Sequence, residues 1–227
     1  MTDLTPLADI NSQRQAIRQQ VRKLRKALSP EQQQQAAQQL SEQLLQLPQI
    51  VDATHIALYL SNDAELDTTP LIQALWQAGK QIYLPILHPF VPGYLIFQSY
   101  QQDTPMKLNQ FQIPEPVLNC AQLIPVAKLD VICTPLVAFD NKGNRLGMGG
   151  GFYDRTLSQL EASSANKTVF NQANTTQAGL TQAKPLQKKP LLIGLAHQCQ
   201  QVVQLPIAAW DIPLSLIVTP GEIFRQS

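Results

Sequence analysis

Residues 55–85, HIALYLSNDAELDTTPLIQALWQAGKQIYLP, contain the clearest indication of a fold class in this chain. Residues 55–60 form a short and almost wholly apolar run, which is typical of a strand covered on both faces. Thr69-Pro70 opens a helix that reaches Gly79, and residues 81–85 form the next strand. A strand, a helix and a second strand in this order make a βαβ unit, which favours a parallel sheet with a right-handed crossover.

Strand-like runs continue on the C-terminal side of this unit. Apolar stretches predict further strands within residues 94–100, 129–139, 191–196 and 214–219, and a helix is expected over residues 152–160. We therefore expect a single α/β domain over the whole chain, with three layers: a mostly parallel sheet flanked by helices on both faces.

A first helix is expected over about residues 14–28. Aliphatic residues recur there at helical spacing, namely Ile17, Val21, Leu24 and Leu28. Arg14, Arg18 and Arg25 fall on one flank of that apolar stripe and make the helix basic. On helix geometry alone, such a flank is a solvated face.

A second helix follows directly. Ser29 is placed as its N-cap, Pro30 as its first residue and Gln32 as the partner in a capping box. This helix is expected to run to about Leu47, where Pro48 stops it. Farther along, residues 163–190 are polar and lack apolar periodicity, which predicts an exposed insertion within the domain.

The composition is that of an ordinary globular protein. With 44% hydrophobic and 15% charged residues and a net charge of +1, the chain gives no global electrostatic reason to expect a nucleic-acid or membrane partner. The N-terminus lacks the apolar segment of a signal peptide, so we expect a cytoplasmic protein. We also expect a monomer. Trp76 and Trp210 lie in apolar sequence contexts that predict core positions.

Residues 144–155, NRLGMGGGFYDR, carry the chemistry. Four glycines between a strand and a helix let backbone N–H groups approach an anion, and the helix adds its N-terminal partial positive charge. Arg145 supplies a planar charged fork suited to phosphate or carboxylate. Phe152 and Tyr153 offer flat surfaces for a ring, and Asp154 is a carboxylate of the kind that accompanies Mg²⁺ at nucleotides.

Glycines alone do not establish this function. The segment is neither a GxxxxGK[ST] phosphate loop nor a clean GxGxxG fingerprint. The competing interpretation is a tight strand-to-helix turn in which Asp154 caps the helix.

The spacing R-L-G-x-G-x-G-[FY]-Y-D-R resembles the signature of the 5-formyltetrahydrofolate cyclo-ligase (5,10-methenyltetrahydrofolate synthetase) family. The resemblance covers about residues 14–160 and 190–222, and the glycine-rich segment is its most specific part. Residues 58–84 and 111–116 also resemble family segments, as does the stretch from Trp210-Asp211 to Thr219. That family implies a fold like that of the sugar-phosphate isomerase group.

The resemblance implies an enzyme that uses ATP and Mg²⁺. The family converts 5-formyltetrahydrofolate and ATP to 5,10-methenyltetrahydrofolate, ADP and phosphate, through a phosphorylated formyl group closed by N10. Such phosphoryl transfer needs positioning and charge neutralisation more than a protein nucleophile.

The resemblance also implies roles for particular residues. Arg145 would act in catalysis, and Asp154 and Asp211 would hold Mg²⁺. The residues implied to bind ATP are Arg14, Arg18, Arg145, Leu146, Gly147, Met148, Gly149, Gly150, Gly151, Phe152 and Tyr153. Those implied to bind the folate are Leu60, Glu65, Met148, Gly149, Gly150, Gly151 and Phe152.

Some of these residues also fit interpretations that do not depend on the family resemblance. Glu65 suits the pterin, because a carboxylate accepts two hydrogen bonds from its N–H groups, but it also fits a plain turn. Met148 and Gly150 stand where some family members carry a basic or aromatic side chain, so the affinity for ATP is open. Two other functions fit an anion loop: a kinase or ligase for another small carboxylated metabolite, and a module that binds a nucleotide or phosphosugar without turnover.

Overall fold

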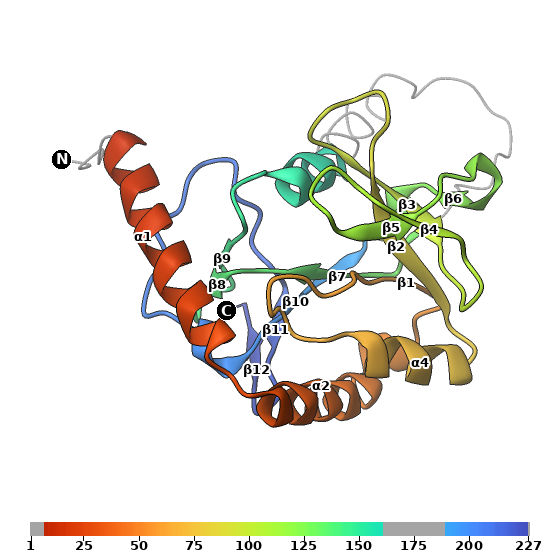
Figure 1. The fold of residues 1–227 in the computed structure, drawn as a ribbon, viewed down its shortest axis with the longest axis horizontal. Helices are drawn as coiled ribbons and strands as arrows, with labels where there is room; N and C mark the ends of the chain where they lie inside the picture. The colour runs from red at the N-terminus through yellow and green to blue at the C-terminus, as the bar shows by residue number, and fades with distance from the viewer. Residues whose placement is uncertain (1–6, 161–188, 227) are drawn as a thin grey trace, which may run out of the picture.

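The computed structural model describes residues 7–160 and 189–226, and most of the expected insertion at 163–190 lies outside these ranges. Its centre is an eight-stranded sheet with the order β12-β11-β10-β7-β1-β2-β3-β6 (Figure 1). The strands of this sheet are β1 (His55–Ala57), β2 (Gln81–Leu87), β3 (Leu95–Ser99), β6 (Leu123–Ile124), β7 (Val131–Pro135), β10 (Leu191–Leu195), β11 (Leu216–Val218) and β12 (Ile223–Arg225).

The five central strands, from β11 to β2, run parallel to their neighbours. The predicted βαβ unit is present as β1, α4 and β2, and a mostly parallel sheet is confirmed. The edges differ from the expectation, because β12 on one side and β3 and β6 on the other are antiparallel. Two more short strands, β4 (Met106–Leu108) and β5 (Pro114–Pro116), form a separate antiparallel pair.

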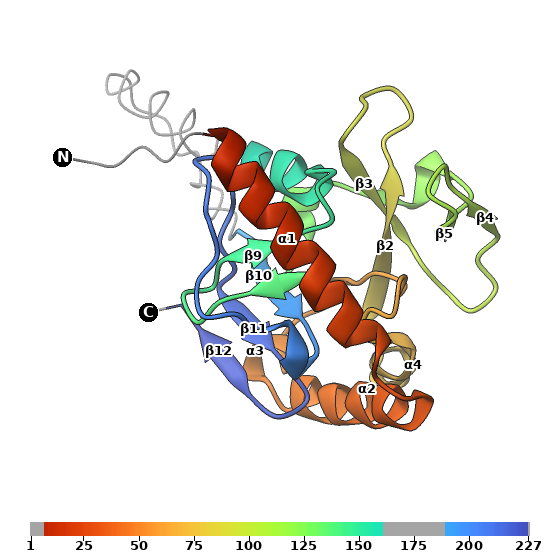
Figure 2. The ribbon, with the colours of Figure 1, turned by 60° about the vertical axis from the view of Figure 1, so that its left-hand side comes forward.

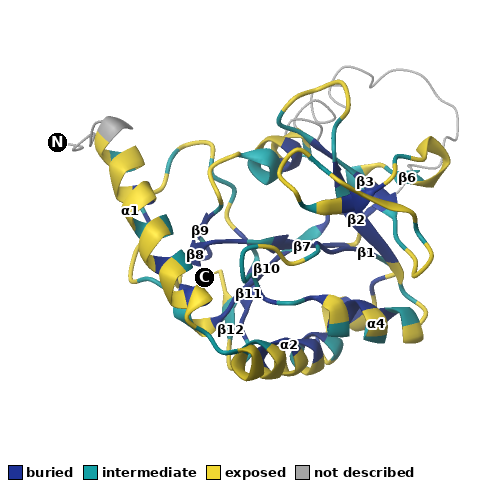
Figure 3. Cartoon of the chain, in the orientation of Figure 1, coloured by how far each residue is buried: buried dark blue, intermediate teal, exposed yellow. Residues whose placement is uncertain are grey.

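Helices cover both faces of the sheet, which gives the expected three layers (Figure 2). On one face α2 (Pro30–Leu45) and α4 (Thr69–Gln77) pack on a core that includes Leu40, Leu75 and Ile56. On the other face Leu157, from the helix that begins at residue 152, packs against Phe97. Figure 3 shows this pattern as a buried sheet with exposed outward faces on α1 and α2.

The N-terminal helix is longer than expected. α1 spans Leu7–Lys26, whereas the apolar periodicity predicted a helix over 14–28. Its Val21 is buried against the chain that follows β7, while Leu24, expected on the same stripe, is 47% exposed.

The Ser29 capping box is present, but Pro48 does not act as a simple stop. The Ser29 hydroxyl accepts from the Gln32 N–H, and the Gln32 side chain accepts from the Ser29 N–H. α2 ends at Leu45, and Pro48 then opens the one-turn helix α3 (Pro48–Val51). Proline at the first position of a helix loses no intrahelical hydrogen bond, so Pro48 can open α3.

The order in which strands are added to the sheet reverses between β1 and β7: β2 lies beside β1 on one side, and β10 lies beside β7 on the other. The chain leaves β1 through α4 on one face and returns to β2, whereas it leaves β7 toward the helix at 152 on the other face before β10. In open α/β sheets such a switch point opens a crevice at the carboxyl ends of the strands, where ligands bind. None of the helices within residues 7–160 and 189–226 combines the length and apolar character needed to span a bilayer.

Candidate active site

The glycine-rich segment joins a short hairpin to a helix. β8 (Ala138–Phe139) pairs with β9 (Arg145–Leu146), and the Asp140 carboxylate organises the turn by accepting from the N–H groups of Lys142 and Asn144. Gly143 has φ 82°, and a Cβ there would lie 2.7 Å from the Leu214 carbonyl oxygen, so glycine is required. This turn fixes Arg145 at the start of the glycine-rich segment, and the helix begins at its end.

A cavity of about 500 Å³ lies at the carboxyl ends of β1, β2 and β7. We call it the apolar cavity, because aliphatic and aromatic side chains such as Leu60, Leu87, Phe111 and Phe152 form most of its wall. Its few charged or amide side chains are Asn62, Glu65, Asn109, Glu115, Arg145 and Asp154. An apolar pocket with a small number of placed polar groups is typical of a site for an organic ligand.

A second cavity, of about 570 Å³, lies between α1, the glycine-rich segment, the helix at 152 and residues 209–213. We call it the arginine cavity. Its lining contains four arginines, Arg14, Arg18, Arg145 and Arg155, against two aspartates, Asp154 and Asp211. This is a local excess of two positive charges in a chain whose net charge is +1, so the cavity favours an anionic ligand.

The two cavities meet at the glycine-rich segment, since both are lined by Arg145, Gly147, Gly151 and Asp154. The Arg145 side chain is only 3% exposed, and its Nη2 donates to Asp154 Oδ1 at 2.6 Å. Its Nη1 is buried without a hydrogen-bond partner among the described residues. A buried guanidinium nitrogen with no acceptor is costly, so Arg145 is suited to an anionic group held at the junction.

Two arginines of α1 enter the arginine cavity. Arg14 forms an ion pair with Asp211 through Nη2 and donates through Nε to the Pro206 carbonyl at 2.9 Å. Arg18 Nε donates to the Gly147 carbonyl at 2.8 Å, which ties α1 to the glycine-rich segment. Burial and the neighbouring Arg14 lower the pKa of Arg18, and Asp211 opposes that shift. An anion in this cavity would therefore stabilise the Arg18 charge.

Glu65 lies in the apolar cavity, in the segment that follows β1. Its Oε2 accepts from the Asn62 N–H at 3.2 Å, and its own N–H donates to the Asn62 carbonyl at 2.9 Å. Burial raises the pKa of Glu65 to about 7, an effect that the Arg25 charge and the Asn62 hydrogen bond oppose. The turn interpretation is thus correct for the backbone, yet the carboxylate also faces the cavity.

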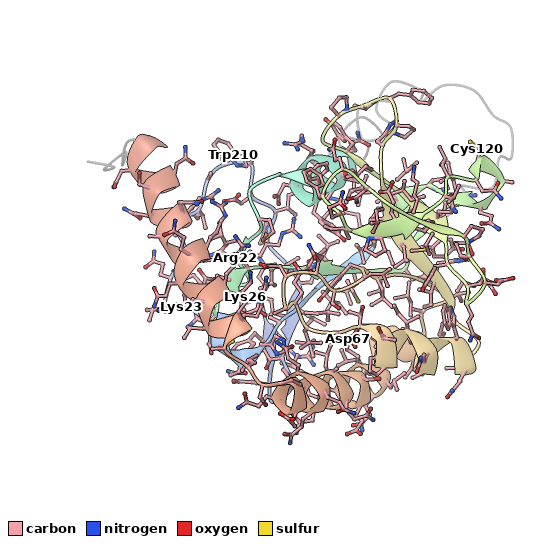
Figure 4. The ribbon with its side chains drawn as sticks, viewed as in Figure 1. Arg22, Lys23, Lys26, Asp67, Cys120 and Trp210 are labelled. Carbon is pink, nitrogen blue, oxygen red and sulfur yellow. The ribbon has the colours of Figure 1, made fainter. Side chains whose placement is uncertain are left out.

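Asp63, which the sequence did not single out, anchors this segment. Its carboxylate receives Arg22 Nε at 2.7 Å, Arg25 Nη2 at 3.0 Å and Lys26 Nζ at 2.6 Å, all from α1. Figure 4 shows Arg22 and Lys26 on the same side of α1. Hydrogen bonding to these cations lowers the pKa of Asp63 well below its usual range. Asp63 and Ala64 have φ of 51° and 58°, a conformation rare outside glycine, so the loop geometry is held by its contacts.

The expectation of a solvated flank is wrong for Arg25. Arg25 is fully buried and donates to both the carboxylate and the carbonyl of Asp63, as well as to the Leu136 carbonyl. Helical periodicity placed it correctly on a flank, but its partners lie 38 and 111 residues away along the chain. Arg25 is therefore a structural residue, and its positive charge opposes the rise in the pKa of Glu65 that burial causes.

The glycine-rich segment divides between the two cavities. Met148, Gly150, Phe152 and Tyr153 line the apolar cavity. Leu146 and Gly149 line the arginine cavity. The departures at Met148 and Gly150 therefore fall on the apolar side. Asp154 and Asp211 line one cavity, although each is paired with an arginine.

The prediction of a core position is wrong for Trp210. This residue is 58% exposed and lines the arginine cavity next to Asp211. Its apolar neighbours in sequence, such as Ile212 and Pro213, line the same cavity instead of a core. Trp76 is half-buried and packs against the main core.

Glu115 is a further polar residue of the apolar cavity, and no role was predicted for it beyond its place in residues 111–116. It is 5% exposed, and its Oε2 accepts from the Leu87 N–H at 3.1 Å and from Asn109 Nδ2 at 3.4 Å. These bonds tie the loop between β4 and β5 to β2. Glu115 therefore shapes the wall that carries Phe111, whose ring lies edge-on to Phe152 at 5.7 Å.

Comparison with known proteins gives consistent matches. The sequence pattern of the 5-formyltetrahydrofolate cyclo-ligase family matches residues 10–182. The 5-formyltetrahydrofolate cyclo-ligases of Escherichia coli (strain K12) and Haemophilus influenzae are 43% and 48% identical, over 90% and 88% of this chain and 99% and 94% of their own. The solution structure of Aquifex aeolicus 5,10-methenyltetrahydrofolate synthetase has a TM-score of 0.71 at 27% identity, over 94% of this chain and 92% of that one.

Proposed function

The chain belongs to the 5-formyltetrahydrofolate cyclo-ligase family, and on that basis we propose that it converts 5-formyltetrahydrofolate and ATP to 5,10-methenyltetrahydrofolate, ADP and phosphate. One observation carries the proposal at the level of the site. An apolar cavity with a carboxylate and a cavity with four arginines meet at the buried pair of Arg145 and Asp154. A reaction between an organic acceptor and a polyphosphate needs such a junction.

The folate is assigned to the apolar cavity. Its pterin is a flat ring with an N–H edge, and Glu65 supplies acceptor oxygens among apolar walls that include Leu60. Met148, Gly150 and Phe152 line the same cavity close to the junction, which suits the part of the substrate that carries the formyl group. ATP is assigned to the arginine cavity, with its phosphates on Arg14, Arg18 and the N–H groups of the glycine-rich segment.

The chemistry starts with the formyl oxygen, which is a poor leaving group. This oxygen attacks the γ-phosphorus, the bond to the ADP oxygen breaks, and an imidate phosphate forms. N10 then attacks the formyl carbon, the carbon–oxygen bond breaks with loss of phosphate, and N10 releases its proton. Phosphoryl transfer of this kind depends on positioning and charge neutralisation.

Arg145 is the side chain best placed for that neutralisation. It lies at the junction, and its Nη1 has no protein acceptor among the described residues. Its bond to Asp154 and its position 5.7 Å from the Tyr153 ring centre hold the guanidinium plane before any ligand arrives. A donor that is already oriented stabilises developing charge without reorganisation, which is the main source of such catalysis.

The residues fit a Mg²⁺ ion at the nucleotide. Asp154 and Asp211 line the arginine cavity together, and one or two carboxylates are what proteins usually give to nucleotide-bound Mg²⁺. Within the described residues no three His, Cys, Asp or Glu side chains form a metal site, so phosphate oxygens would complete the coordination. When bound, the ion would neutralise charge on the β- and γ-phosphates.

The test is an absorbance assay for methenyltetrahydrofolate, run with and without ATP and Mg²⁺. Product that depends on both is expected. Release of ADP with another carboxylated acceptor would favour a different kinase or ligase, and saturable ATP binding without turnover would indicate a nucleotide-binding module.

Variants test the site within the same assay. Arg145→Ala is expected to lower kcat by about 100-fold or more, and Asp154→Asn to abolish turnover, while both proteins keep wild-type circular dichroism. Arg225→Ala, an exposed arginine of β12 outside both cavities, is the matched control. Wild-type activity in Asp154→Asn would remove the metal assignment.

A further inference from the structure

We propose that the indole of Trp210 is the stacking platform for the nucleobase of the nucleotide. This inference rests on the assignment of ATP to the arginine cavity. It adds a base-binding residue to the phosphate, metal and folate contacts proposed above.

The aromatic content of the two cavities points to Trp210. Phe152 and Tyr153, the rings beside the glycine-rich segment, line the apolar cavity. Among the described residues that line the arginine cavity, Trp210 is the only aromatic one. A base held in that cavity therefore has one protein ring available for stacking.

The surroundings of Trp210 form an apolar wall in a charged cavity. Ala209, Ile212 and Pro213 line the cavity beside it, whereas the arginines come from α1, β9 and the helix at 152. Figure 4 places Trp210 on the segment between the N-terminal half of α1 and that helix. A nucleotide has the same division, with an apolar flat base at one end and anionic phosphates at the other.

The exposed indole is carried by a well-anchored turn. Asp211 N–H donates to the Ala208 carbonyl at 3.0 Å, and Asp211 Oδ2 accepts from the Ala208 N–H at 2.8 Å and from Arg14. Arg14 Nε also holds the Pro206 carbonyl at 2.9 Å. A 58% exposed tryptophan on an anchored turn loses little conformational freedom when a ring stacks on it, and this favours binding.

Stacking predicts a measurable and selective loss. By analogy with base–aromatic stacking elsewhere, Trp210→Ala is expected to raise the KM for ATP by about 10- to 100-fold. The KM for the folate and kcat at saturating ATP should change by less than about 2-fold, because stacking on the base is the same in the ground state and in the transition state. Trp210→Phe should restore most of the affinity, since any flat ring offers a stacking surface.

The chain allows a direct optical test, because it has two tryptophans. Trp76 lies in α4, where its indole N–H donates to the Tyr100 carbonyl at 3.1 Å and its ring packs on Tyr100. In Trp76→Phe, fluorescence reports Trp210 alone. Titration with MgATP is expected to change that fluorescence saturably, while Mg-tripolyphosphate, which has no base, should compete with ATP but leave the emission nearly unchanged. In Trp210→Ala, the remaining Trp76 signal should not respond to MgATP.

The outcomes separate this inference from the proposed function. An unchanged KM for ATP in Trp210→Ala, or no fluorescence response at ATP concentrations that saturate turnover, would overturn the platform while the ligase assignment stands. A base-dependent response without formation of methenyltetrahydrofolate would support the platform and defeat the ligase assignment. No binding of MgATP to the wild-type protein would overturn both.

Discussion

Asp63→Asn tests whether a buried ion pair holds the loop that presents Glu65. Asp63 receives three cations, but they are not equivalent. The side chains of Arg22 and Lys26 are 40% and 54% exposed, whereas that of Arg25 is fully buried. Exposed pairs contribute about 0–1 kcal/mol each, while removing one partner of a buried pair costs about 3–5 kcal/mol because the other charge is left uncompensated.

We expect Asp63→Asn to lower the free energy of unfolding by about 3 kcal/mol, the lower end of that range. Arg25 keeps its bonds to the Asp63 and Leu136 carbonyls, which belong to the backbone. Asparagine is chosen because it tolerates the left-handed conformation at φ 51°, so backbone strain does not add to the effect. With an m-value of about 2 kcal/mol/M, the urea midpoint should fall by about 1.5 M.

Matched variants isolate the buried charge. Arg22→Ala and Lys26→Ala remove the exposed partners and should each cost less than about 1 kcal/mol. Arg25→Met combined with Asp63→Asn removes both buried charges, so the double variant should be more stable than Asp63→Asn alone. If Asp63→Asn unfolds at the same urea concentration as Arg22→Ala, the buried-pair reasoning is refuted.

The loss of stability in Asp63→Asn should also depend on pH. The pKa of Asp63 is depressed in the folded protein, so its contribution to stability is present above the unfolded pKa of about 3.9 and is lost as the pH falls below that value toward the folded pKa. The stability difference between the wild-type protein and Asp63→Asn should therefore be full at pH 7 and shrink below about pH 4. A difference that stays constant down to pH 2.5 would argue against a charge effect.

Two further predictions concern the apolar cavity and the core. Glu65→Gln should raise the KM for the folate by about 10- to 100-fold with little change in that for ATP. Because burial raises the pKa of Glu65 to about 7, the wild-type KM for the folate should rise as the pH falls through 7, and steady-state assays should show no such rise in the variant. Gly194→Ala places a Cβ 2.5 Å from Leu214 and 2.7 Å from Leu136, and should cost about 1–3 kcal/mol in urea unfolding. Gly221→Ala, with no atom within 4 Å of its Cβ, should be nearly neutral.

The central layer of the fold could be predicted because it depends on local pattern. Residues 55–60 are almost wholly apolar, as expected for β1, which lies between two parallel strands in a sheet with a hydrophobic core on each face. The elements that were missed are short or paired at the edge, such as β12 and the β8–β9 hairpin. Two or three residues do not establish a period, so their pairing depends on neighbours that the local sequence does not reveal.

The site shows the same division between local and long-range information. The glycine-rich segment carries its own signal, since glycines, Arg145 and Asp154 lie within ten residues of one another. Arg25 and Trp210 carry no such signal. One is buried because Asp63 meets it from 38 residues away, and the other is exposed although its sequence neighbours are apolar. The two predictions were wrong because a charged residue was expected at the surface and a residue with apolar sequence neighbours was expected in the core.

The positions of the arginines explain why the net charge of the chain did not indicate an anionic ligand. The chain has seven arginines: four line the arginine cavity, Arg22 and Arg25 hold Asp63, and Arg225 lies elsewhere. No lysine among the described residues lines either cavity, although the chain has ten. A guanidinium stays charged when buried and forms several directed hydrogen bonds, which an ammonium group does not. The positions of the arginines therefore create both the anion site and the ion pairs that hold the loop of Glu65. A count of 17 positive and 16 negative residues does not reveal these positions.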